Sequence, residues 1–76
     1  MRLPIIAGRE LVKILIKAGF EVDHITGSHI ILRQAVYPYL RVTVPNHPEL
    51  KKGTLLSILK RAGLTRELLF KLLNRR

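Results

Sequence analysis

The chain has 76 residues, enough for one small domain, and it has no cysteine, which excludes disulfides, thiolate metal sites and a cysteine nucleophile. Its 14 Lys and Arg outnumber 5 Asp and Glu, and the net charge of +9 points to nucleic acid, an anionic membrane or an acidic protein as partner. No apolar run approaches the ~20 residues of a membrane-spanning helix. From the length and the lack of a signal or membrane-spanning segment we expect one cytoplasmic domain spanning residues 1–76. Because the basic residues are spread along the chain, we expect nucleic acid rather than membrane as its partner.

The N-terminal part of the chain predicts a helix followed by a strand. Residues 8–18 have apolar side chains at helical spacing, with Gly8 as the expected N-cap and Gly19 as the expected stop. Residues 20–25 alternate between apolar and polar, which is typical of a half-buried strand. The turn residues Thr26-Gly27-Ser28 follow.

Two further strands are predicted after this turn. Residues 29–34 are rich in β-branched side chains, and residues 35–39 form a connection interrupted by Pro38. Residues 40–45 alternate, so we expect Leu40, Val42 and Val44 to face the core and Pro45 to end the strand.

Helices are predicted again over residues 54–62 and 66–74. The order α-β-β-β-α with an extra C-terminal helix indicates an α+β fold, in which helices cover one face of a three-stranded antiparallel sheet. Ile30 and Leu32 are expected to point inward, toward the helices. We call the opposite face the open face, and we expect it to carry His29, Ile31, Arg33, Arg41 and Thr43.

Most kinds of catalytic centre find no support in this sequence. The histidines His24, His29 and His47 form no helical pair and the acidic residues are scattered, so we expect no metal and no other cofactor. The sequence also has no G-x-S-x-G nucleophile motif and no phosphate-binding Walker loop.

Gly27-Ser28-His29 is the remaining candidate, because it places an imidazole on a strand directly after a glycine turn. Histidine suits proton transfer near neutral pH, and RNA carries its own nucleophile, the 2′-hydroxyl. A ribonuclease can therefore work with a positioned proton-transfer group and cations around the phosphate. On spacing alone, His29 could equally be a structural residue that hydrogen bonds beside the turn.

Four segments together make the chain resemble the HicA (YcfA-like) toxin family. They are K-A-G-F at 17–20, G-S-H at 27–29, V-P-N-H-P at 44–48 and K-K-G-T-L-L-S-I-L-K-R-A-G-L at 51–64. The resemblance implies a double-stranded-RNA-binding-domain-like fold, an endoribonuclease that cleaves mRNA and blocks translation, and a HicB-type antitoxin as partner. It also implies that His29 is the catalytic histidine. The chain departs from the family at Thr26, where members often carry a basic residue, and at residues 34–39, where they often have a short polar hairpin.

Basic side chains are the expected RNA-binding residues. Lys51 and Lys52 precede the second long helix, whose free N–H groups can bind an anion, and Arg33 and Arg41 are expected to hold phosphates from the open face. Tyrosines 37 and 39 could stack on bases or simply pack. Two alternatives to a ribonuclease stay open: a non-catalytic RNA-binding module, and a basic scaffold for an acidic protein.

Overall fold

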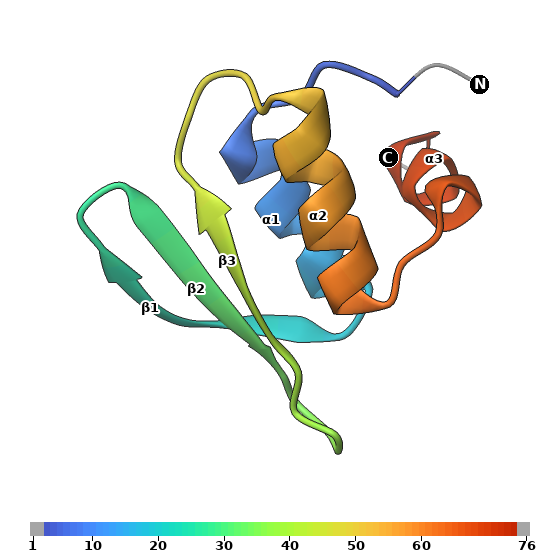
Figure 1. Cartoon of the computed structure of the whole chain (residues 1–76). Helices are drawn as coiled ribbons and strands as arrows, with labels where there is room; N and C mark the ends of the chain where they lie inside the picture. Colours follow the sequence, from blue (N-terminus) through green and yellow to red (C-terminus); the bar gives the residue numbers. More distant parts are fainter. Residues whose placement is uncertain (1–2, 75–76) are drawn as a thin grey trace.

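A computed structural model describes residues 3–74 of the chain, and the first two and last two residues of the predicted domain lie outside this range. The sheet is antiparallel with strand order β1-β2-β3. This is the predicted α-β-β-β-α arrangement of double-stranded-RNA-binding domains, with the extra C-terminal helix (Figure 1). The elements are α1 (Gly8–Lys17), β1 (Phe20–Thr26), β2 (His29–Gln34), β3 (Arg41–Pro45), α2 (Lys52–Ala62) and α3 (Arg66–Asn74).

Helices α1 and α2 lie side by side on one face of the sheet, and α3 packs against α1 on the side away from the strands (Figure 1). Their apolar faces meet the inward side chains of β2 and β3. The predicted inward pair Ile30 and Leu32 is buried, as are Val42 and Val44. Burying each aliphatic side chain of this kind stabilises the fold by roughly 1.5–3 kcal/mol. Of β1 only Phe20 is buried, so most of this edge strand extends beyond the cover of the helices.

The prediction that Leu40 faces the core is wrong. Leu40 precedes β3, which begins at Arg41, and its side chain is 37% exposed. The backbone turns at Tyr39, which has a φ of 56°, and the Leu40 N–H then donates to Oε1 of Gln34. The β2–β3 connection therefore includes Leu40, and the strand begins one residue later than the alternating pattern of residues 40–45 predicts.

The predicted ends of several elements also shift slightly. Helix α2 begins two residues earlier than predicted, at Lys52, whereas α1 ends at Lys17 and β1 extends to Thr26. The N-cap of α1 is Ala7, not Gly8. Gly8 has a different role, because a Cβ at this position would overlap the carbonyl oxygen of Pro45, and its N–H donates to the His47 carbonyl at 2.9 Å. Glycine therefore lets the start of α1 lie directly against the end of β3.

A β-bulge interrupts β1. The register with β2 shifts between Val22 and His24, so that Asp23 is the extra residue. Unbroken alternation over residues 20–25 would place His24 on the face of Phe20 and Val22. After the bulge, His24 instead lies opposite Ile31 on the open face.

Candidate functional site

Cross-strand pairing organises the open face into three rows of side chains. Successive strand residues point to opposite faces and paired residues share a face, so the register fixes which side chains are neighbours. From the hairpin end downward, the rows are Thr26–His29–Pro45, His24–Ile31–Thr43 and Glu21–Arg33–Arg41. The predicted open-face residues thus share one face, with the histidine and the arginines at opposite ends.

His29 is the first residue of β2 and is exposed. Gly27 has a φ of 51° and makes the preceding turn, and the carbonyl of Ser28 accepts a hydrogen bond of 2.7 Å from the Asn46 N–H. This backbone bond ties the hairpin to the loop after β3. The His29 ring itself has no hydrogen bond or ion pair within residues 3–74. A structural histidine beside a turn would use its ring in such a bond, so this geometry favours a ring available to a ligand.

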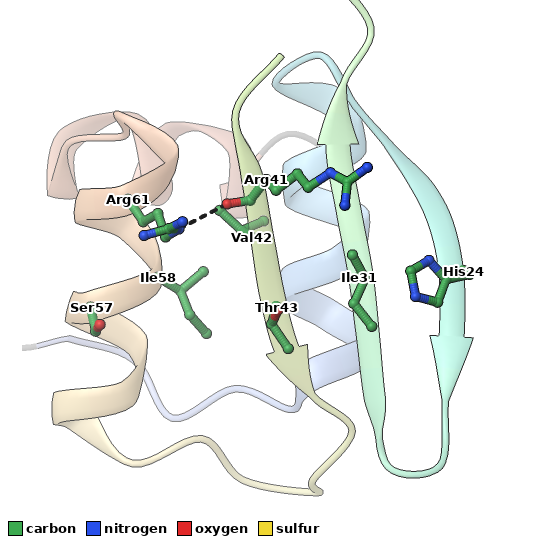
Figure 2. A pocket seen from close by; sticks show the side chains of 8 residues that line it. All are labelled: His24, Ile31, Arg41, Val42, Thr43, Ser57, Ile58 and Arg61. Atoms are coloured by element: carbon green, nitrogen blue, oxygen red, sulfur yellow. Dashed lines mark hydrogen bonds between the residues drawn. The ribbon is translucent and has the colours of Figure 1, made fainter. Parts of the chain in front are cut away.

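Arg33 and Arg41 lie directly opposite each other, and the Arg41 side chain extends across the sheet toward β2 (Figure 2). Like charges in this position destabilise a sheet unless an anion lies nearby. Asp23 supplies one negative charge: the hydrogen bond with His24 lowers the pKa of its carboxyl group, and the charges of Arg33 and Arg41 lower it further. Two guanidinium groups on an open face also suit the phosphates of a nucleic acid.

A hollow of about 530 Å³ lies between the open face and α2 (Figure 2). None of the described residues that line it is acidic, and they supply two guanidinium groups, two hydroxyls and an imidazole over an aliphatic floor. They are His24, Ile31, Arg41, Val42, Thr43, Ser57, Ile58 and Arg61. Nε of Arg61 donates to the Arg41 carbonyl at 3.0 Å, which fixes α2 against the edge of β3. The hollow therefore suits a phosphate-bearing ligand.

Lys51 and Lys52 are the N-cap and the first residue of α2, and both are exposed. No acidic residue lies in this first helical turn, so the free N–H groups and the lysines form a positive end. These lysines follow the end of β3, whereas Arg41 stands at its beginning. The structure thus brings Arg33 and Arg41 together and places Lys51 and Lys52 separately, at the start of α2.

Comparison with known proteins identifies the family. Residues 8–64 match the family model described as HicA toxin of bacterial toxin–antitoxin. The chain belongs to the HicA toxin family. The match runs from α1 through α2, so it includes the open face and the hollow of this HicA chain but not α3. No curated protein and no solved structure matches it.

The sequence also singled out two tyrosines and a third histidine. Tyr37 and Tyr39 are exposed and contact each other edge to face, with ring centroids 6.2 Å apart, so they do not pack into the core. His47 is exposed, and its carbonyl accepts a hydrogen bond from the Gly8 N–H at the start of α1.

Within residues 3–74, no three His, Asp or Glu side chains are grouped as a metal site would require. No helix in this range has the length and apolar content to cross a bilayer.

The structure adds site residues that the sequence analysis missed. The ring of His24 lies 2.9 Å from the Asp23 carboxylate and borders the hollow, and Arg61 and Ser57 border it from α2. The sequence does contain a sign that His24 lies on the open face. Val22 and Ile25 are apolar residues three apart in a strand, and this spacing indicates a bulge between them. The contribution of α2 depends on how close the helix lies to β3, which no local pattern predicts.

Proposed function

We propose that this HicA-family protein is a metal-independent endoribonuclease that binds and cleaves mRNA and thereby blocks translation, with His29 as a general acid or base. The observation that carries the proposal is the exposed His29 ring, which has no protein partner within residues 3–74, on a sheet face that also carries two paired arginines. The G-S-H segment supports the same assignment, since it is where the family resemblance places the catalytic histidine.

The chemistry requires little more than these groups. The 2′-hydroxyl of RNA attacks the adjacent phosphorus, giving a 2′,3′-cyclic phosphate and a free 5′-hydroxyl, so the protein need not supply a nucleophile. Arg33 and Arg41 hold phosphates on the open face, and Lys51 and Lys52 bind another part of the strand at the start of α2. The 2′-hydroxyl requirement restricts cleavage to RNA.

As a member of a toxin–antitoxin family, the protein is expected to have an antitoxin partner. We propose a HicB-type protein with an acidic patch that covers the open face and His29. Ile31 supports this placement, because it is only partly buried and lies amid basic and polar side chains. An apolar centre with a charged rim is typical of a protein interface.

The deciding experiment compares wild type with His29→Ala at equal protein levels, by growth inhibition after induction and by cleavage of purified RNA. General acid–base catalysis contributes roughly 10²–10⁴-fold, so the variant should lose cleavage by about that factor. Its thermal unfolding should be unchanged, because the ring is exposed. His47→Ala is the matched control, an exposed histidine on the loop after β3.

Equal toxicity and equal cleavage by His29→Ala would contradict the catalytic role. Salt-dependent RNA binding without cleavage by the wild type would favour the non-catalytic RNA-binding module. Absence of RNA binding would leave the basic scaffold for an acidic protein.

A further inference from the structure

The side chains of Asp23 and His24 are in hydrogen-bond contact at the bulge of β1. Nδ1 of His24 is 2.9 Å from Oδ2 of Asp23. This contact uses one ring nitrogen and leaves the other, Nε2, without a protein partner within residues 3–74. The ring borders the hollow between the sheet and α2, so the unused nitrogen is available to a ligand bound there (Figure 2).

The bulge also makes His24 a neighbour of His29. His24 pairs with Ile31, and His29 precedes Ile31 by two residues on the same strand face. The backbones of two residues in such diagonal positions on adjacent strands are roughly 7–8 Å apart, which is within reach of long side chains. Two imidazole rings on one exposed face can then approach the same phosphodiester from different sides.

We propose that His24 is a second catalytic histidine, which shares with His29 the two proton transfers of RNA cleavage. The proposal rests on the ribonuclease function proposed above and adds a group that the G-S-H segment does not contain. A proton-transfer residue must come within about 2.6–3.2 Å of the atom it serves. The free nitrogens of His24 and His29 can meet this requirement at two oxygens of one bound phosphodiester.

The reaction needs both groups because a proton leaves one oxygen and another proton arrives at a second oxygen. One neutral ring takes the proton of the 2′-hydroxyl as its oxygen bonds to phosphorus. One protonated ring gives a proton to the 5′-oxygen as its bond to phosphorus breaks. The products are the 2′,3′-cyclic phosphate and the 5′-hydroxyl, and no water or cofactor is consumed.

Asp23 is the positioning residue in this arrangement. Its carboxylate accepts the hydrogen bond from Nδ1–H, which fixes the ring orientation and directs Nε2 toward the substrate. Charged and titratable groups surround His24 on every neighbouring element: Glu21 and Asp23 on β1, His29 and Arg33 on β2, Arg41 on β3 and Arg61 on α2. Arg33 and Arg41 lie in the next row of the open face, on the side of His24 away from His29, where they can hold a neighbouring phosphate of the same RNA strand.

The experiment uses two forms of one short oligoribonucleotide, after the cleaved position has been mapped with wild-type protein. The first is ordinary RNA. In the second, sulfur replaces the bridging 5′-oxygen at the cleaved bond, so that the leaving group departs without a proton. His24→Ala, His29→Ala and the control His47→Ala are compared with wild type on both substrates, across pH 5 to 9.

On ordinary RNA, His24→Ala and His29→Ala should each slow cleavage by roughly 10²–10⁴-fold, and the control should not. The sulfur substrate should restore cleavage by whichever variant lacks the acid and should not restore the other. Wild type should show a bell-shaped pH profile, and each variant should lose one limb of it. Asp23→Asn should slow cleavage less than His24→Ala, with the bell shape retained.

Ordinary cleavage by His24→Ala would overturn the assignment of His24 while leaving the proposed ribonuclease intact. The assignment of His24 would also fail if His24→Ala changed only KM and kept the bell-shaped pH profile. It would fail equally if the sulfur substrate restored cleavage by neither variant. Absence of cleavage by the wild type would overturn the proposed function itself, and the role of His24 with it.

Discussion

The two faces of strand β2 differ in what they require of their residues. On the covered face, Ile30 and Leu32 lie among the helices and are almost fully buried. On the open face, His29 and Arg33 are exposed, and Arg33 stands opposite a second arginine. Packing accounts for the covered face, whereas on the open face Arg33 and Arg41 lie opposite each other, and the protein offsets their charge only in part, with Glu21 opposite Arg33 and with Asp23. Neighbouring residues of one strand are therefore expected to divide between stability and RNA binding.

The largest expected effect comes from comparing Leu32→Ala with Arg33→Ala. Leu32 is 0% exposed, and truncating such a residue costs about 2–5 kcal/mol of unfolding free energy through lost burial and the cavity left behind. Arg33→Ala should change this free energy by no more than about 0.5 kcal/mol. RNA affinity should respond in the opposite way. It should fall for Arg33→Ala, and it should be unchanged for the folded fraction of Leu32→Ala.

Chemical denaturation and RNA binding of the two variants measure both quantities on the same preparations. Similar losses of stability would mean that Arg33 contributes to the fold and that the two faces are not independent. An unchanged RNA affinity for Arg33→Ala would remove this residue from the binding surface.

The sequence predicted which side chains of β2 and of Val42 to Val44 in β3 point toward the helices, but it did not predict this for β1. Inward and outward residues could be assigned on β2 because its neighbour β3 alternates cleanly at Val42 and Val44. On β1 the bulge at Asp23 reverses the alternation, and the position of His24 changes with it. Leu40 was misplaced because the turn at Tyr39 takes it out of the strand.

The candidate site was predictable where its residues are close in sequence. His29 follows from the G-S-H segment, and Lys51 and Lys52 from the start of a helix. The hollow joins β1, β2, β3 and α2, so its outline depends on tertiary distances. Arg61, for example, lines the hollow and donates from Nε to the carbonyl of Arg41, twenty residues earlier in the chain.

A smaller effect should distinguish the start of α2 from the open face. Salt weakens binding to single-stranded RNA with a log–log slope of about −0.7 per phosphate contact. Replacing both Lys51 and Lys52 by Ala should therefore make the slope less negative by about 1.4 if each lysine contacts a phosphate. Binding of an uncleaved RNA, titrated across salt concentrations, gives the slope.

The matched control replaces Lys13 and Lys71, which are also exposed but lie on α1 and α3. Equal changes in slope for the two double variants would indicate diffuse attraction to the net charge. An unchanged slope for the first double variant would place the phosphate contacts elsewhere on the protein.

The smallest expected effect is the pH dependence that Asp23 gives to folding. The pKa of Asp23 is lowered from its ordinary value of 3.8, chiefly by the hydrogen bond with His24 and further by the charges of Arg33 and Arg41. As the pH falls below 3.8, the unfolded chain takes up the proton before the folded chain does. The stabilisation by Asp23 is therefore complete above this ordinary value and is lost as the pH falls through the lowered one.

Unfolding free energies of wild type and Asp23→Asn, measured from pH 6 down to pH 2, should accordingly converge at the acid end. A difference that stays constant with pH would show that the carboxylate titrates alike in both states. Repeating the series in 1 M salt separates the causes, because the Debye length then falls to about 3 Å. The contributions of Arg33 and Arg41 should fade, while the direct contact of Asp23 with His24 persists. The pH dependence that remains in 1 M salt then measures the direct contact between Asp23 and His24. This is the contact by which Asp23 is proposed to orient the His24 ring.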